Sequence, residues 1–203
     1  MIKKRRQMAP TLDGIRDDHL ERYRFAARLI KERGIKKAVD VGCGCGYGSY
    51  ILATEGGCSV IGYDIDPEAV EYGKQQYPHE NVHRFTSDLP DILITPGTAL
   101  VMFEIIEHSR LAPSFLARAM AQGPPLLVCS VPNENAVPFK WPKVHPEHYR
   151  HYTPRELEEE LKTIAGEWKI IFKGSQPGKH NQDARIVEND LAGRTLVFVA
   201  EPK

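Results

Sequence analysis

The fold is decided by the stretch Val39-Asp40-Val41-Gly42-Cys43-Gly44-Cys45-Gly46-Tyr47-Gly48-Ser49. Residues 38–41 form a short apolar run that is typical of a buried strand, and residues 47–53 have the pattern of a following helix. Glycine lacks a Cβ, so the glycines between them can adopt positive φ and let the backbone approach a ligand. A helix N-terminus adds free N–H donors. The stretch therefore predicts a strand, a tight turn and a helix that together bind a polar group.

Strand and helix patterns alternate on both sides of this unit. Apolar, β-rich runs are followed by helical periodicity several times, so we expect a parallel, doubly wound sheet. Two later β-rich runs, residues 169–173 and 195–200, are joined without a helical pattern and should close the sheet as an antiparallel pair. The expected fold is α/β, a Rossmann-like doubly wound seven-stranded sheet, mostly parallel with an antiparallel C-terminal strand, plus an N-terminal helix. The other expected strands are 59–63, 82–85, 99–103 and 126–131, and the expected helices are 17–31, 67–77 and 111–120.

Length and composition predict one domain over residues 1–203, because no linker or charge block divides the chain. The chain has 27 lysines and arginines against 27 aspartates and glutamates, so its overall charge does not favour nucleic acid or an anionic membrane. Residues 1–14, with their basic run at 3–6, are expected to be a flexible tail. No apolar run reaches the ~18 residues of a membrane span, and no signal peptide is evident. With four cysteines outside any disulfide or C-x-x-C pattern, we expect reduced thiols and a cytoplasmic protein.

The glycine spacing separates two kinds of nucleotide site. The dinucleotide fingerprint G-x-G-x-x-G requires a third glycine at position 47, where this chain has Tyr47, and the spacing here is G-x-G-x-G. Asp64 follows Gly42 by 22 residues, close to the usual spacing of an acid that accepts the ribose hydroxyls of an adenosine ligand. Asp66 precedes Pro67 and is better suited to cap the next helix. The pattern disfavours a nicotinamide-dependent oxidoreductase.

The glycine turn with its preceding acid closely resembles motif I of class I S-adenosylmethionine (SAM)-dependent methyltransferases. This resemblance implies that SAM is bound by the core, residues 36–131, below a lid helix at residues 15–33. Ile65 would pack on the adenine, and Asp88 in the segment after the third strand would accept from the adenine amino group. The cofactor-binding residues implied are Asp40, Gly42, Cys43, Gly44, Gly46, Tyr47, Asp64, Ile65, Ser87, Asp88, Leu89, Phe103 and Glu104.

A second group of polar residues follows the fourth expected strand, in Phe103-Glu104-Ile105-Ile106-Glu107-His108. If this stretch is a helical turn, its glutamates and histidine at i, i+3 and i+4 share one face. Residues 133–152 form a His-rich loop on the expected acceptor side, with His145, His148 and His151 as candidates for the same site. The candidate catalytic residues are His108, Glu107 and His148.

The E-x-x-E-H pattern is similar to that of ubiquinone-pathway O-methyltransferases and of small-RNA 3′-terminal 2′-O-methyltransferases. In the RNA enzymes the glutamates, the histidine and a later histidine hold a divalent metal beside the acceptor hydroxyl. The resemblance implies a Mg, Mn or Zn ion held by Glu104, Glu107, His108 and His145. The His-rich loop aligns only loosely with that of the RNA enzymes, so His148 and His151 stay open as the fourth ligand. In the alternative, His108 acts as a general base without metal.

A wider resemblance, over most of residues 15–165, is to a bacterial and phage group within the ubiquinone-methyltransferase-like set. It is carried by residues 19–27, 45–49, 104–108, 130–133 and 148–157. It implies methyl transfer to a small-molecule or sugar acceptor, at oxygen, by a monomer or homodimer. Alternatives are a metal-dependent RNA 3′-terminal 2′-O-methyltransferase and an inactive SAM-binding regulatory domain. Residues 174–193 have no clear periodicity and fit either an ordered hairpin arm or a flap.

Overall fold

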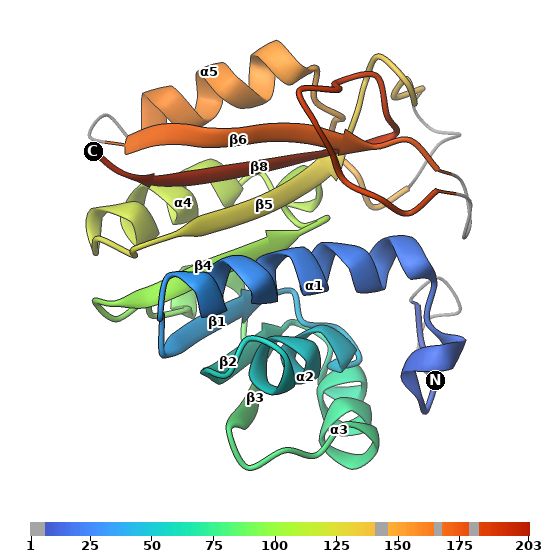
Figure 1. Ribbon diagram of the computed structural model, residues 1–203, viewed down its shortest axis with the longest axis vertical. Helices are drawn as coiled ribbons and strands as arrows, with labels where there is room; N and C mark the ends of the chain where they lie inside the picture. The colour runs from blue at the N-terminus through green and yellow to red at the C-terminus, as the bar shows by residue number, and fades with distance from the viewer. Residues whose placement is uncertain (1–6, 141–145, 165–167, 179–182) are drawn as a thin grey trace.

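A computed structural model describes residues 7–140, 146–164, 168–178 and 183–203. One mixed sheet with the order β3-β2-β1-β4-β5-β8-β6-β7 crosses the molecule (Figure 1). The first five strands in sequence pair in parallel, and β8 runs antiparallel to both β5 and β6. The strands are β1 (Lys37–Val41), β2 (Ser59–Asp64), β3 (Val82–Thr86), β4 (Thr98–Phe103), β5 (Leu127–Pro132), β6 (Trp168–Gln176), β7 (Val187–Glu188) and β8 (Thr195–Pro202).

The Rossmann-like fold predicted from the sequence is confirmed, with one strand more than expected. The additional strand is β7, which pairs antiparallel with Gly174 and Ser175 near the end of β6. Two residues that lack a repeating apolar pattern give no strand signal in the sequence, so pairing with β6 defines this strand. The described residues of 174–193 thus include this strand pair, whereas residues 179–182 lie outside the described part.

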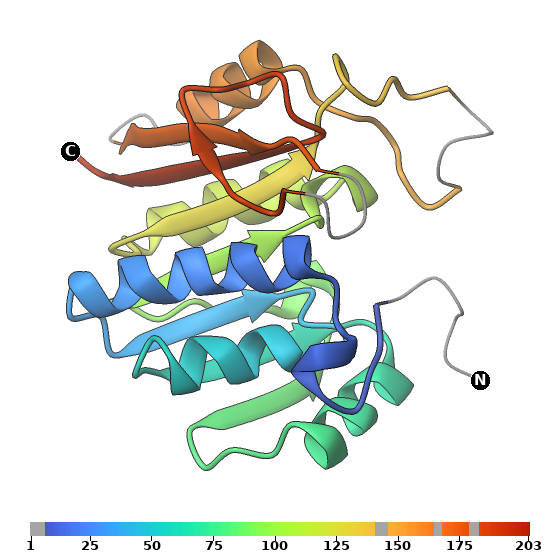
Figure 2. The same ribbon diagram turned by 45° about the vertical axis from the view of Figure 1, so that its right-hand side comes forward.

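Helices cover both faces of the sheet (Figures 1 and 2). One apolar core lies under α1 and α2, and the other lies under α4 and α5. In the described ranges, no helix is long and apolar enough to cross a membrane. The helices are α1 (Asp17–Glu32), α2 (Tyr47–Thr54), α3 (Pro67–Gln76), α4 (Ala112–Ala121) and α5 (Pro154–Ile164), with short 3-10 turns η1 (Leu12–Gly14), η2 (Leu89–Asp91) and η3 (Ile106–His108).

Strand β4 shows why the sheet needs both layers. Val101 and Phe103 pack into the core under α1, whereas Leu100 and Met102 pack into the core under α4. Successive side chains point to opposite faces of a strand, so a strand covered on both faces reads as a continuous apolar run. The apolar run ends at Phe103, where the chain leaves the sheet and the polar Glu104 follows.

The cap of α3 that the sequence predicts at Asp66 is present in the structure, and α5 also begins with a cap. Asp66 accepts hydrogen bonds from the backbone N–H groups of Glu68 and Ala69 at the start of α3. At the start of α5, Thr153 and Glu156 exchange side-chain to backbone hydrogen bonds as a capping box. All four cysteines are buried, and none of them is in a disulfide among the described residues.

The segment before α1 differs from the flexible tail expected over residues 1–14. Residues 7–14 pack on the domain: the Tyr77 hydroxyl donates to the Ala9 carbonyl oxygen at 2.6 Å. Ala9 is buried in the core that α1 covers. The basic run at residues 3–6 lies outside the described residues. This short segment has no periodic apolar pattern, so the sequence gives no signal of its few anchoring contacts.

A buried carboxylate joins β1 to two helices. Asp40 is 0% exposed. Its Oδ1 accepts from the Tyr23 hydroxyl of α1 at 3.1 Å, and its Oδ2 accepts from Ser49 Oγ of α2 at 2.7 Å. The Tyr23 ring lies against Gly48, where an added Cβ would be 2.0 Å from a ring carbon. Glycine at this position therefore lets the tyrosine reach Asp40.

This network gives a prediction for stability against pH. Burial raises the pKa of Asp40 to about 6, despite the two hydrogen bonds, which lower it. The folded-state pKa of Asp40 thus exceeds its unfolded value. Proton binding by Asp40 therefore contributes fully to the free energy of unfolding below the unfolded pKa, and this contribution is lost as pH rises through about 6. We expect the free energy of unfolding of wild type, minus that of Asp40→Asn, to fall by on the order of 3 kcal/mol between pH 4 and pH 7. Urea unfolding followed by circular dichroism measures both, and a pH-independent difference would contradict the prediction.

Candidate functional site

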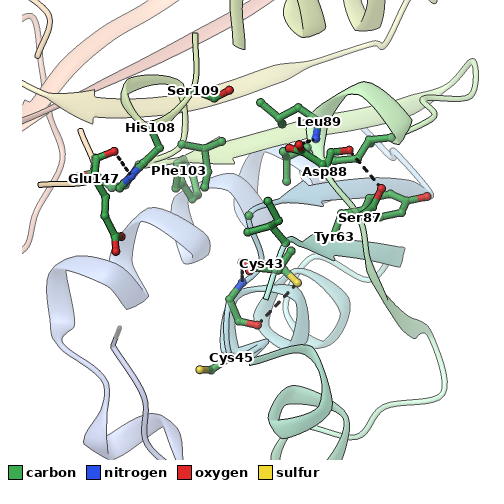
Figure 3. A pocket seen from close by; sticks show the side chains of 18 of the residues that line it. Cys43, Cys45, Tyr63, Ser87, Asp88, Leu89, Phe103, His108, Ser109 and Glu147 are labelled. Atoms are coloured by element: carbon green, nitrogen blue, oxygen red, sulfur yellow. Dashed lines mark hydrogen bonds between the residues drawn. The ribbon is translucent and has the colours of Figure 1, made fainter. Parts of the chain in front are cut away.

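A cavity of about 750 Å³ opens at the carboxyl edge of the parallel strands. Its walls come from the glycine turn after β1, the ends of β2, β3 and β4, the first half of α1 and the loop at residues 147–149. Figure 3 shows His108 and Glu147 at one end of it, Ser87 and Asp88 at the other, and Cys43 between them. Ligands of open α/β sheets bind at this edge, so the cavity is the candidate site.

The glycine turn has the backbone that its sequence requires. Gly42, Gly44 and Gly46 have φ of 74°, 52° and 84°. A Cβ on Gly42 would lie 1.9 Å from the Ile105 side chain, so close packing as well as φ requires glycine there. The backbone N–H groups of Gly42 and Cys43 both donate to the Tyr63 carbonyl oxygen, which fixes the turn on β2.

The predicted turn residues divide into two groups. Gly42, Cys43, Gly44 and Tyr47 line the cavity, as the cofactor assignment expected. Gly46 faces away and its carbonyl oxygen accepts from Arg84 Nη2 at 2.9 Å. Asp40 also lies off the cavity wall, below the turn with Tyr23 and Ser49. Both residues therefore act on the shape of the turn in this structure.

Asp64 lines the cavity at the end of β2. Its Oδ2 accepts from the Gly44 N–H at 2.8 Å, and its Oδ1 accepts from the Asp66 N–H at 2.9 Å. An ionised carboxylate oxygen can accept more than one hydrogen bond, so this position suits a pair of ligand hydroxyls. Asp66, the competing acid, is engaged as the cap of α3. Beside Asp64, Ile65 is 64% exposed and offers an apolar surface to the cavity.

The far end of the cavity is formed by Ser87, Asp88 and Leu89. Asp88 caps η2 by accepting from the Leu89 N–H at 2.7 Å. Tyr63 and Ile92 add apolar wall at this end, and the sequence did not single them out. A flat, apolar ligand group with polar edges fits such surroundings.

Glu104 has an unusual backbone at the end of β4. Its φ is 55°, in the left-handed region that non-glycine residues rarely adopt. Its N–H donates to the Ser130 carbonyl oxygen at 3.1 Å, and its Oε1 accepts from Ser130 Oγ at 3.0 Å, so β5 holds this conformation. Backbone strain of this kind is common at functional sites. Phe103 and Glu104 both line the cavity.

The expected helical face of Glu104, Glu107 and His108 does not form. The 3-10 turn η3 begins at Ile106, so Glu104 precedes it. The structure instead groups Glu107, His108 and His148, each offering one ligand atom within 4.8 Å of the others. Glu104 is near enough to raise the pKa of Glu107 electrostatically. His145, part of the predicted metal set, lies outside the described residues.

Glu107 is a buried acid whose oxygens lack hydrogen bonds. It is 0% exposed, and neither Oε1 nor Oε2 has a hydrogen-bond partner among the described residues. Burial, and then the charge of Glu104, raises the pKa of Glu107 well above its usual value. An unpaired buried carboxylate is costly unless a proton or a cation neutralises it. Together with two imidazoles, it is a donor set that fits a divalent cation.

A backbone carbonyl orients the imidazole of His108, and the imidazole of His151 orients that of His148. His108 Nδ1 is 3.2 Å from the Glu147 carbonyl oxygen, which can only accept, so Nδ1 carries the proton in the neutral ring. Its Nε2, 3.9 Å from Glu107 Oε1, then carries the lone pair. In the loop, His151 Nδ1 donates to the Val137 carbonyl oxygen at 2.6 Å, and His148 Nδ1 lies 2.9 Å from His151 Nε2. With both rings neutral, this pair of hydrogen bonds puts the proton of His148 on Nδ1 and its lone pair on Nε2.

The sequence did not identify the contribution of α1 to the cavity wall. His19, Arg22 and Tyr23 line it, and Arg22 is only 3% exposed. A detectable signal was present, because Asp18 and Arg22 lie one helical turn apart on the face that also carries the core residues Ala26 and Ile30. Charged residues on a buried helix face point to a polar site or a buried network.

Comparison with known proteins agrees with this geometry. Residues 33–109 match a family described as a methyltransferase domain. No curated protein sequence matches the chain. Among solved structures, the methyltransferase domain of a bacterial Hen1 (CtHen1-C) superposes with a TM-score of 0.72 at 19% identity, over 91% of this chain and 98% of that one.

Two further structures share the fold. Magnesium protoporphyrin IX methyltransferase from Synechocystis PCC 6803, with bound SAH, has a TM-score of 0.68 at 16% identity, over 92% of this chain and 84% of its own. The small RNA methyltransferase HEN1 has a TM-score of 0.67 at 16% identity and is covered over 27% of its length by 99% of this chain. The match to a methyltransferase domain, which contains the glycine turn, supports a SAM-dependent methyltransferase, and the solved structures share its fold.

Proposed function

We propose that this protein transfers a methyl group from SAM to a hydroxyl oxygen of a sugar or related small molecule. The observation that carries the proposal is the group of Glu107, His108 and His148: the two histidines line the end of the cavity opposite Asp88, and Glu107 is buried beside them. It offers either a cation site or a base beside the place where an acceptor can enter. Membership of the ubiquinone-methyltransferase-like group, implied by the sequence resemblance, is part of the same proposal.

The proposed donor site uses the residues along the cavity wall. The ribose hydroxyls of SAM would bind Asp64, and its adenine would lie against Ile65 and Leu89 with its amino group toward Asp88. The methionine part would then cross the glycine turn and bring the sulfonium toward Glu104 and His108. Positioning is the main task of the protein, because the sulfonium already activates the methyl group.

Methyl transfer breaks the methyl carbon–sulfur bond as the acceptor oxygen forms its bond to the methyl carbon, and S-adenosylhomocysteine leaves. The hydroxyl proton must also depart. A divalent cation held by Glu107, His108 and His148 would supply Lewis-acid polarisation that makes the hydroxyl easier to deprotonate. In the metal-free alternative, the Nε2 lone pair of His108 accepts this proton. Glu104 and the loop histidine His145 complete the metal set proposed from the sequence.

Charges along the cavity favour a neutral acceptor. Four acids line it, Asp64, Asp88, Glu104 and Glu147, against two arginines, Arg22 and Arg110. A nucleic-acid backbone binds mainly through positive charge, and among the described residues that line this cavity the acids outnumber the arginines. The second candidate, methylation of an RNA 3′-terminal 2′-hydroxyl, is favoured by the Glu107, His108 and His148 group and by the Hen1 structures of the same fold.

The donor site predicts different effects for two neighbouring aspartates. Asp64→Asn replaces an acceptor of two backbone N–H groups by an amide that can accept at only one atom. We expect it to raise the Kd for SAM about 10–100-fold, the effect of losing charge-assisted hydrogen bonds. Asp66→Asn, the matched control, should lower stability by at most about 1 kcal/mol through the α3 cap and leave the Kd unchanged. Isothermal titration calorimetry distinguishes them, and equal Kd values for both variants would remove Asp64 from the donor site.

The metal proposal predicts that the protein binds Mn²⁺ through Glu107. Wild type should bind about one Mn²⁺ per chain, and Glu107→Gln should lose this binding because a neutral amide is a poor ligand for a hard cation. Glu147→Gln is the matched control, since His108 uses the backbone carbonyl of Glu147 and not its side chain. Equilibrium dialysis followed by electron paramagnetic resonance gives the occupancy. Methyl transfer that is unchanged by EDTA and by added Mn²⁺ would support the metal-free role of His108 instead.

The acceptor proposal is tested with SAM labelled in its methyl group. We expect label to enter a pool of sugars and glycans as an alkali-stable methyl ether. RNA is assayed with its 3′ ends intact and after periodate oxidation, which destroys the terminal diol. Label in intact RNA that disappears after oxidation would favour the RNA function. SAM binding without transfer to any pool would favour the regulatory alternative.

A further inference from the structure

His151 is a buried histidine behind the candidate cation site. His108 and His148 line the cavity, whereas His151 is 5% exposed and lies beyond them. The ring of His148 packs against both others, with centroid distances of 4.4 Å to His108 and 5.1 Å to His151. The three imidazoles therefore form a row that begins at the cavity wall and ends inside the protein.

The backbone around His151 is fixed on both sides. Tyr152, the next residue, is buried in the core under α4, and its N–H donates to the Pro132 carbonyl oxygen at 3.1 Å. Before His151, the Tyr149 N–H donates to the Glu107 carbonyl oxygen at 2.8 Å. The segment that carries both loop histidines is thus bound to the end of β5 on one side and to η3 on the other.

The direction of the hydrogen bonds along this row is set at its inner end. His151 Nδ1 is 2.6 Å from the Val137 carbonyl oxygen, which can only accept, so Nδ1 carries the proton of the neutral ring. Val137 is held in a turn after β5, where its N–H donates to the Asn133 carbonyl oxygen at 2.8 Å. The lone pair of His151 is then on Nε2, which accepts from His148 Nδ1 at 2.9 Å. One backbone carbonyl thereby determines the tautomers of two successive imidazoles.

The tautomer of His148 decides whether it can bind a cation. His148 offers a ligand atom to the group that it forms with Glu107 and His108. An imidazole ligates a metal through a nitrogen that carries a lone pair, and the hydrogen bond of the other nitrogen decides which one that is. With its proton on Nδ1, His148 has this lone pair on Nε2, whereas the opposite tautomer would present an N–H group there. A hydrogen-bond acceptor at Nδ1 therefore favours cation binding, as outer partners of metal-bound histidines do.

We propose that His151 is a positioning residue of the cation site, which holds His148 in the tautomer whose Nε2 binds a divalent cation. His151 itself is not a ligand, because Val137 engages its Nδ1 and His148 engages its Nε2. The inference rests on the cation site of the proposed function. It gives separate roles to two loop histidines that the sequence left open as the fourth ligand.

The tautomer is measured by long-range ¹H–¹⁵N correlation spectra of the protein without a cation, at about pH 8, where an ordinary imidazole is neutral. We expect His148 to be protonated on Nδ1 in wild type, with its signals assigned by their absence from His148→Gln. His151→Phe removes the acceptor and should move this proton to Nε2. His151→Gln offers an amide oxygen in its place and should keep the proton on Nδ1.

The cation affinity is measured with Mn²⁺ by equilibrium dialysis and electron paramagnetic resonance. We expect His151→Phe to raise the Kd for Mn²⁺ about 10–100-fold, the usual effect of losing an outer partner of a ligating histidine. His151→Gln should stay within about threefold of wild type, because it restores the acceptor. His83→Gln, at an exposed position of β3, is the matched control and should change neither the affinity nor the tautomer of His148.

Wild type with His148 protonated on Nε2 would overturn the inference, and this measurement serves where His151→Phe does not fold. Wild-type Mn²⁺ affinity in His151→Phe would also overturn it. So would equal losses in both His151 variants, since His151 would then be a ligand or only a support of the loop. Calorimetric titration with SAM separates these outcomes from the proposed function. Wild type that binds SAM but not Mn²⁺ would contradict the cation site and this inference, whereas absence of SAM binding would contradict the donor itself.

Discussion

The structure depends on the buried carboxylate of Asp40. It lies below the glycine turn, and its two oxygens accept from Tyr23 and Ser49, so α1, α2 and β1 meet at one point. Burying a carboxylate is unfavourable, and two donors offset part of that cost. The result is a turn whose backbone is held from below while its upper surface lines the cavity. The same contact brings the first half of α1, with Arg22 and His19, to the cavity wall.

Much of the fold could be predicted from the sequence because its elements are locally encoded. Strand β4 is a continuous apolar run, α3 begins at an Asp-Pro cap, and α5 begins with a capping box. Strand β7 could not be predicted, because two residues carry no pattern and pair only through β6. The packing of residues 7–14 was also missed, since single contacts such as that of Tyr77 with Ala9 leave no periodic signal.

For the site, the sequence located the residues but not their geometry. The positions of the glycine turn and of Asp64 could be predicted from their spacing in the sequence, because a short turn between a strand and a helix allows few backbone conformations. The Glu104–His108 segment was expected as one helical face, but β5 holds Glu104 at positive φ through Ser130, a contact between residues distant in the chain. Arg22 gave a weaker signal, and its side chain is bound by Gln176 from near the opposite end of the sequence. Tertiary contacts decide such features, and one sequence alone does not specify them.

The charges of the cavity match those of the proposed donor. SAM is positive at its sulfonium and ammonium groups and negative at its carboxylate. The acids Asp64, Glu104 and Glu147 give most of the cavity a negative potential, which favours the positive groups. Arg22 supplies the opposite charge on the part of the wall that α1 forms. A divalent cation near the sulfonium would be repelled by the positive charge of the sulfonium. The carboxylates of the buried Glu107 and of Glu104 would offset that repulsion. The burial of Glu107, which costs free energy in the protein without a bound cation, is thus consistent with the proposed chemistry.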